Sequence, residues 1–139
     1  MRSSVALVRA TCEEVGRQVA LMMDIKGPEI RTGAREGSID IVAGDSVVFH
    51  EAKSEFASVE GVIPIEINYP WLHEDLKPGC TVVVDSGLLR FVVEKIEGGN
   101  VWCRTEVGGR LGSRRHINLP GIHVRLPSLT DKDLSLIHI

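Results

Sequence analysis

Cysteine is scarce in this sequence of 139 residues, and its scarcity excludes two classes of small protein. The three cysteines, Cys12, Cys80 and Cys103, are odd in number, lie far apart and form no Cys-x-x-Cys pair. Disulfide-rich folds and structural zinc sites both need closely patterned cysteines. The sequence therefore predicts reduced thiols in a cytoplasmic protein.

Aromatic residues and runs of positive charge are also scarce. Phe, Trp and Tyr make up 4% of the sequence, the formal net charge is -3, and the longest basic run is the pair Arg114 and Arg115. Proteins that bind single-stranded nucleic acid combine aromatic stacking with a basic groove. A nucleic-acid partner is therefore not expected, although small β-barrels often bind oligonucleotides.

Long apolar runs are missing as well. No stretch approaches the roughly 18 residues of a membrane helix, and the N-terminus lacks the basic and then apolar layout of a secretory signal. Neither a membrane partner nor export is expected. The hydrophobic share of 43% and the charged share of 25% are those of a globular protein with a buried core.

Residue spacing predicts a helix followed by a buried strand and then by many short strands. Apolar residues recur every three to four positions over residues 3–17, and residues 19–23 are wholly apolar. Turn residues then alternate with β-type residues, which is typical of a small β-barrel or sandwich. The predicted strands are 38–42, 46–50, 61–67, 81–85, 88–96 and 101–107.

Two connections in this β-rich region are predicted in more detail. The Glu97-Gly98-Gly99-Asn100 segment between the last two strands is typical of a β-hairpin. Residues 69–76 are expected to form one helical turn. Its apolar residues Trp71, Leu72 and Leu76 are expected to close one end of the barrel.

The buried strand at residues 19–23 leads into a charged turn that carries the strongest functional signal. Asp24, Lys26, Glu29 and Arg31 surround the pair Gly27-Pro28, which must end the strand. One interpretation is a solvated turn whose charges pair with one another. The other interpretation, a functional site, follows from the order of the residues. Asp24–Gly33 resembles a signature of the pyruvate kinase family at the end of the third strand of its (β/α)8 barrel, with Ile25 replacing Thr.

A second resemblance to the same family follows the β-rich region. Residues 108–121 resemble the signature Gly-Gly-x-Leu-Gly-Ser-x-Lys-Gly-x-Asn-Leu-Pro-Gly, except that Arg115 replaces Lys and His116 replaces Gly. The resemblance spans residues 5–133. It implies a mainly β fold, a small β-barrel like the inserted B domain of pyruvate kinase, flanked by a partial α/β (TIM-barrel) segment.

The resemblance also implies a division of the chain. Residues 1–27 are a helix and strand of the (β/α)8 barrel, residues 28–121 are the inserted lid domain, and residues 122–133 return to the barrel. Thr130 and Asp133 predict a capping box at the next helix. Residues 134–139 have the wrong apolar pattern for that helix and are expected to be a non-native tail.

The function implied is that of a fragment of a glycolytic kinase. Pyruvate kinases transfer a phosphoryl group between phosphoenolpyruvate and ADP, giving pyruvate and ATP, with Mg²⁺ and K⁺. By resemblance, the Asp24 carboxylate and the Ile25 backbone carbonyl are K⁺ ligands, and Arg31 and Arg115 contact the nucleotide. The intact enzyme is expected to be a homotetramer.

Several assignments keep an alternative. Arg115 is either a nucleotide ligand or a solvent-exposed arginine, because a guanidinium replaces the family's ammonium. Asp85 either helps water or Mg²⁺ near the nucleotide or serves an Asp-Ser-Gly turn. Lys26 either senses phosphate or pairs with Glu29, and the pairing is favoured. The remaining histidines, such as His50 and His73, are unclustered and are assigned no metal.

The family's catalytic arginine and lysine and its Mg²⁺ ligands match no position of this sequence. The chain alone is therefore expected to be inactive. The competing hypothesis for the whole chain is a free-standing, non-catalytic β-barrel module that binds a small anion or a protein.

Overall fold

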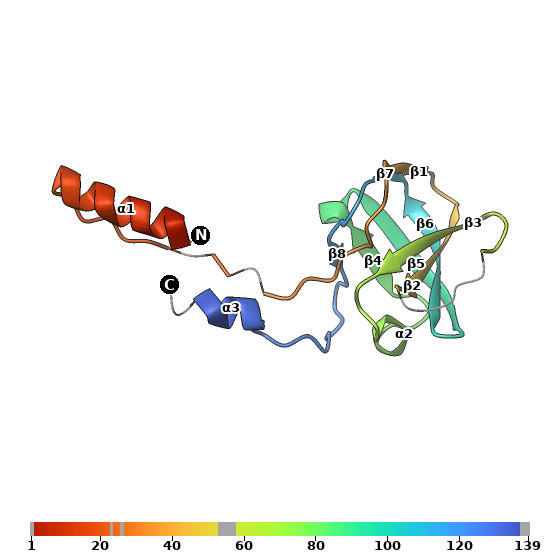
Figure 1. Ribbon diagram of the computed structural model, residues 1–139. Helices are drawn as coiled ribbons and strands as arrows, with labels where there is room; N and C mark the ends of the chain where they lie inside the picture. Colours follow the sequence, from red (N-terminus) through yellow and green to blue (C-terminus); the bar gives the residue numbers. More distant parts are fainter. Residues whose placement is uncertain (1, 23, 26, 53–57, 137–139) are drawn as a thin grey trace. The chain divides into compact units, whose positions relative to one another are not determined.

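The computed structural model describes residues 2–22, 24–25, 27–52 and 58–136. The chain divides into two compact units: Glu29–Arg125 forms the larger one, and Met1–Pro28 with Leu126–Ile139 forms the smaller one. Within these described residues, the larger unit is rich in strands and the smaller one is helical (Figure 1). The predicted mainly β fold class is confirmed.

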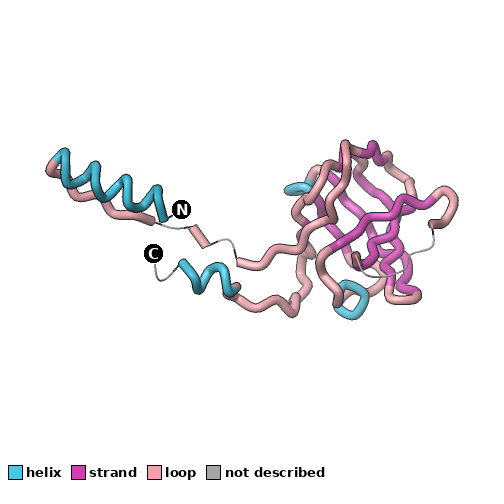
Figure 2. The backbone as a smooth tube through the Cα atoms, viewed as in Figure 1, coloured by secondary structure: helices cyan, strands magenta, loops and turns pink. Residues whose placement is uncertain are grey.

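A curled six-stranded sheet forms the body of the larger unit (Figure 2). Its strand order is β3-β2-β6-β5-β4-β8, and every neighbouring pair is antiparallel except β2 and β3, which are parallel. The strands are β2 (Ser46–Glu51), β3 (Val62–Ile67), β4 (Thr81–Val84), β5 (Leu89–Glu97), β6 (Asn100–Val107) and β8 (Ile117–Asn118). A separate antiparallel pair joins β1 (Ile39–Ile41) to β7 (Gly109–Leu111).

Residues 30–33 join the two edges of the six-stranded sheet. On the β8 side, the Ile117 amide donates to the Ile30 carbonyl over 2.8 Å. On the β3 side, the Gly33 amide donates to the Glu66 carbonyl over 2.7 Å. Both edge strands thus share one partner, and the sheet closes as a barrel. Closure occupies backbone groups that an open edge would offer to other chains.

A very close backbone approach occurs where β6 leads into β7. A Cβ atom added at Gly108 would lie 2.4 Å from the Ile41 carbonyl oxygen and 2.8 Å from the Val42 Cα. At the next position, Gly109, an added Cβ would lie 3.5 Å from its nearest neighbour, the Leu88 carbonyl oxygen. Only glycine fits at residue 108, whereas residue 109 has room for a methyl group.

The barrel core is made by alternate residues of the central strands. In β6, Val101, Cys103 and Thr105 are buried while the residues between them are more exposed. The rings of Phe49 and Phe91 meet edge to face, with 5.4 Å between their centroids, which is a favoured geometry for aromatic pairs. Alternate residues of this strand therefore face the core, as the pleat of a β-strand requires.

The predicted hairpin between β5 and β6 is confirmed. Glu97 and Asn100 are cross-strand partners, and Gly98 and Gly99 have φ values of 59° and 77°. A two-residue turn with positive φ at both positions matches the twist of its flanking strands and favours glycine. The two glycines therefore select this turn.

The predicted helical turn is α2 (Leu72–Asp75). Leu72 and Leu76 are buried as expected, but Trp71 is 40% exposed and packs edge to face against Tyr69. The expectation for Trp71 was wrong. Its indole ring covers the tyrosine instead of entering the core.

Tyr69 and α2 hold the chain where it leaves the larger unit. The buried Tyr69 hydroxyl donates to the Asp75 carboxylate and accepts the Arg125 amide proton over 2.8 Å. The Arg125 Nε lies 3.1 Å from Asp75, and its Nη1 bonds to Glu74. Burial, followed by the bond to Asp75, raises the pKa of Tyr69. The last residue of the larger unit is thus bound on its backbone and its side chain.

The smaller unit contains α1 (Arg2–Val15), which ends two residues before the end of the helix predicted at residues 3–17. Gly16 has a φ of 68°, and the Arg17 amide donates to the Cys12 carbonyl over 3.0 Å, a helix stop that favours glycine. The strand predicted at residues 19–23 is not observed: residues 17–22 form no regular structure, and Met22 is 96% exposed. Position 23 lies outside the described residues. A strand needs a neighbouring strand, and none pairs with this segment in the described part.

The second helix of the smaller unit, α3 (Asp131–Leu136), begins at the predicted capping box. The Asp133 amide donates to the Thr130 hydroxyl over 3.2 Å, and the Thr130 amide donates to the Asp133 carboxylate over 2.8 Å. These bonds lower the pKa of Asp133. The helix continues over residues 134–136, so the expectation that they have the wrong pattern for it was wrong. Residues 137–139 lie outside the described part.

Among the residues that the structure describes, neither α1 nor any other helix has the length and apolar character of a membrane-spanning segment.

Candidate functional site

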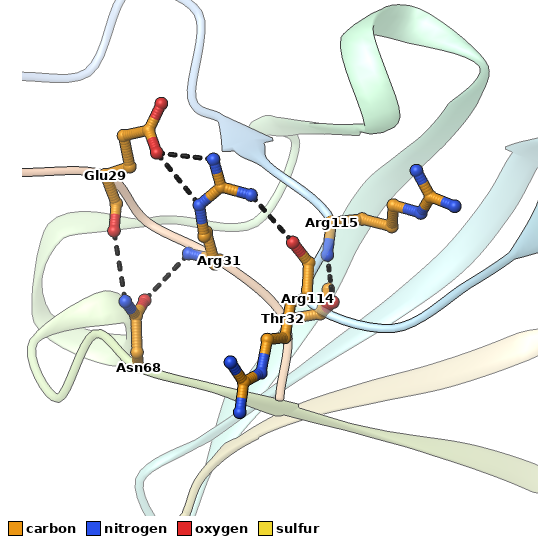
Figure 3. Close-up of polar contacts among 6 residues, drawn as sticks. All are labelled: Glu29, Arg31, Thr32, Asn68, Arg114 and Arg115. Carbon is orange, nitrogen blue, oxygen red and sulfur yellow. Dashed lines mark hydrogen bonds and ion pairs between the residues drawn. The ribbon is translucent and has the colours of Figure 1, made fainter. Parts of the chain in front are cut away.

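Two segments more than eighty residues apart lie side by side at one end of the barrel. Arg31 is the cross-strand partner of His116. The Thr32 amide donates to the Arg115 carbonyl, and the Arg115 amide donates to the Thr32 hydroxyl, each over 2.8 Å. The buried Thr32 thus fixes the backbone of Arg115 (Figure 3). The predicted nucleotide ligands Arg31 and Arg115 are brought together at the level of the backbone.

Three hydrogen bonds to two partners hold the Arg31 guanidinium. Its Nε and Nη2 donate to one carboxylate oxygen of Glu29, and its Nη1 donates to the Arg114 carbonyl over 2.8 Å. The side chain remains 39% exposed. Arginine carries five N–H donors in a planar fork, so three engaged donors orient the guanidinium and leave others for a ligand.

The Asn68 side chain holds the backbone on which Arg31 and Glu29 stand. Its side-chain oxygen accepts the Arg31 amide proton over 2.7 Å, and its side-chain nitrogen donates to the Glu29 carbonyl over 3.0 Å (Figure 3). Asn68 was not predicted from the sequence. An asparagine at the end of a strand is common in turns. Its partners are nearly forty residues away in the sequence, so no local signal distinguished it.

Arg115 pairs with Asp85 across the end of the barrel. Its Nη1 lies 3.6 Å from the Asp85 carboxylate, and the two side chains are 47% and 22% exposed. The side chains of Arg31 and Arg115 point in different directions from their adjacent backbones (Figure 3). The two guanidinium groups therefore have separate acidic partners.

Asp85 also occupies the turn that was its alternative interpretation. Asp85, Ser86 and Gly87 have φ values of 54°, 57° and 101°. Non-glycine residues seldom adopt positive φ, and Asp is among the more tolerant. The Asp85 amide donates to the His116 carbonyl over 2.9 Å, which ties the turn to the Arg115 segment. The turn and the contact with Arg115 are thus compatible.

The predicted K⁺ ligands lie in the smaller unit. Asp24 and Ile25 belong to an exposed segment without regular structure. Their carboxylate and carbonyl are hard oxygen donors, which suit a hard cation. Among the described residues, no group of three or more His, Cys, Asp or Glu is arranged to hold a metal ion. Lys26 lies outside the described residues, and Glu29 pairs with Arg31.

Comparison with known proteins gives one consistent result. The family model for the pyruvate kinase barrel domain matches residues 1–139. The chain is 36% identical over 140 residues to a pyruvate kinase of Clostridium acetobutylicum, covering 94% of the chain and 27% of that protein. It is 36% identical over 128 residues to pyruvate kinase 1 of Trypanosoma brucei brucei, covering 91% and 26%.

A solved structure agrees with these sequence matches. The crystal structure of a pyruvate kinase from Cryptosporidium parvum superposes with a TM-score of 0.75 at 30% identity, covering 93% of this chain and 26% of that one. The chain thus spans about a quarter of the length of the relatives it matches.

Proposed function

Because this chain belongs to the pyruvate kinase family, we propose that it supplies the lid over the nucleotide when a phosphoryl group passes between phosphoenolpyruvate and ADP. The observation that carries the proposal is the pairing of residues 31–32 with residues 115–116, which brings both signature segments to one end of the barrel. Phosphoryl transfer depends mainly on positioning and charge stabilisation, and two adjacent arginine-bearing segments suit that task.

In this role Arg31 and Arg115 bind phosphate oxygens of the nucleotide. A planar guanidinium matches paired oxygens better than a point charge does. When the lid closes, it excludes water and strengthens each charge contact within the site. Asp85, which faces Arg115, acts beside the nucleotide on water or Mg²⁺.

The cations belong to the same proposal. The Asp24 carboxylate and the Ile25 carbonyl would contribute two oxygen ligands to K⁺, and their donor chemistry fits that ion. The bound cations would neutralise charge that accumulates between substrate and nucleotide. The complete enzyme would be a cytoplasmic homotetramer that acts in glycolysis.

Replacing Arg31 tests the nucleotide role. Loss of a hydrogen bond to a charged group costs roughly 1.5 to 3 kcal/mol. In the complete enzyme that carries this chain, Arg31→Ala is therefore expected to lower kcat/KM for ADP by roughly tenfold to a hundredfold. The measurement is steady-state kinetics with ADP varied.

The matched control is Arg104→Ala, which removes an exposed arginine of β6 that pairs with Glu94 of β5. It is expected to change kcat/KM for ADP by less than about twofold, because surface ion pairs are weak. An Arg31→Ala enzyme that stays folded and behaves like this control would contradict the nucleotide role.

A second prediction concerns the 139-residue chain by itself. Its residues match neither the family's catalytic lysine nor its Mg²⁺ ligands, so the chain is expected to form no pyruvate from phosphoenolpyruvate and ADP. Pyruvate is measured with Mg²⁺ and K⁺ present and compared with a buffer control. Pyruvate formation that disappears in an Asp24→Ala variant would refute the expectation.

A further inference from the structure

Arg115 follows a path that depends on a glycine. A Cβ atom added at Gly112 would lie 2.7 Å from the Arg115 Nη2, 2.9 Å from its Nε and 3.2 Å from its Cζ. The guanidinium thus lies against the Gly112 backbone, in space that any side chain at residue 112 would occupy. The atoms that an added methyl group at residue 112 would meet belong to the flexible end of the Arg115 side chain. The methyl group would therefore displace the guanidinium and leave the barrel intact.

Asp85 bounds the same space at its other end. Its carboxylate lies 3.6 Å from the Arg115 Nη1, which is an ion pair longer than a hydrogen bond. The backbone brings it there, because the Asp85 amide is bonded to the His116 carbonyl. Asp85 therefore attracts the guanidinium without occupying its donors in short bonds.

The backbone of Arg115 is fixed independently of its side chain. Thr32 bonds to both its amide and its carbonyl. A fixed backbone, a glycine surface and one facing carboxylate favour the observed direction of the guanidinium, although the side chain is 47% exposed. A side chain ordered before binding loses less conformational entropy when a ligand arrives.

We propose that Gly112 and Asp85 are positioning residues, which form a slot that holds the Arg115 guanidinium in its phosphate-binding direction. The inference rests on the proposed nucleotide role of Arg115. It also explains why an arginine suits this chain at a position where the family signature has lysine. A flat guanidinium can lie on a glycine backbone, whereas a lysine ammonium has no planar face to place there.

The slot itself is tested by NMR on the isotopically labelled 139-residue chain. The Nε–H signal of Arg115 is identified as the one missing from Arg115→Lys. It is expected to shift and to exchange faster with water in Gly112→Ala and in Asp85→Asn. It is expected to stay unchanged in Gly109→Ala, where an added methyl group meets only ordinary contacts. An unchanged signal in Gly112→Ala would overturn the slot.

The use of the slot is tested by kinetics of the complete enzyme. Gly112→Ala is expected to lower kcat/KM for ADP about tenfold, as expected for loss of one charge-assisted contact, with KM for phosphoenolpyruvate unchanged. In an Arg115→Lys background the same substitution is expected to change kcat/KM by less than about twofold, because the lysine does not use the slot.

Two results would overturn the inference, and they can be told apart from failure of the proposed function. An equal loss from Gly112→Ala in the arginine and lysine backgrounds would show a general structural effect. Full activity of Gly112→Ala, alongside a loss in Arg115→Ala, would show that nucleotide binding does not depend on the direction in which the slot holds the Arg115 guanidinium. Full activity of Arg115→Ala would instead remove the nucleotide role of Arg115, while the NMR signal would still report the slot.

Discussion

Gly108→Ala is expected to lower the free energy of unfolding by about 3 kcal/mol, the upper end of the range for overpacking substitutions. The added methyl group would lie 2.4 Å from the Ile41 carbonyl oxygen and 2.8 Å from the Val42 Cα. Both are backbone atoms of, or next to, β1, so no side-chain rotation relieves the clash. The β1–β7 pair must separate to accommodate the methyl group.

The adjacent glycine supplies the control. Gly109→Ala places its methyl group 3.5 Å from the Leu88 carbonyl oxygen, within ordinary contact. It is expected to change the free energy of unfolding by less than about 1 kcal/mol, since an alanine also restricts the unfolded chain. Urea unfolding of the two variants and the parent chain makes the comparison. Equal free energies of unfolding for the two variants would disprove the close approach at Gly108.

Cys103 is expected to react with iodoacetamide about a thousandfold more slowly than an ordinary thiol while the chain is folded. Burial, with a smaller effect of the nearby Glu94 charge, raises the pKa of Cys103 from 9.0 to about 12. Alkylation requires the thiolate, and three pKa units lower its fraction by about a factor of a thousand. Cys12 and Cys80, which are partly exposed, serve as internal references.

The experiment follows each cysteine by mass spectrometry of peptides after timed alkylation near pH 8. Cys80 is expected to be modified early and Cys103 about a thousandfold more slowly. In concentrated urea all three are expected to react at similar rates, which controls for sequence effects on the reagent. Modification of Cys103 at the rate of Cys80 in the folded chain would mean that the inner face of β6 is open to solvent.

The local features of the barrel were predictable because short-range chemistry determines them. Gly98 and Gly99 specify the hairpin turn, and the runs of β-type residues between turn residues indicated the longer strands. Closure was not predictable in the same way. It depends on hydrogen bonds from residues 30–33 to two distant segments, and β7 and β8 have only three and two residues, too few to show a period.

In the candidate site, too, local features were predictable from the sequence and long-range contacts were not. The signature resemblance indicated Arg31 and Arg115, but Asn68 and Thr32 act through partners far away in the sequence. Gly112 carried a signal only as part of the signature, with no indication that it accommodates a guanidinium. The strand expected at residues 19–23 failed for the converse reason: apolar composition favours a strand, but a partner must supply its hydrogen bonds.

One short segment, residues 68–75, binds the chain both where it enters the barrel and where it leaves. Asn68 bonds to Glu29, the first residue of the larger unit, and Tyr69 bonds to Arg125, the last. Domains whose ends emerge close together tolerate transplantation into loops of other proteins and rejoining of their ends. Because one segment binds both ends of residues 29–125, this unit has the geometry of an insertable domain, which can be joined to another protein at a single surface turn.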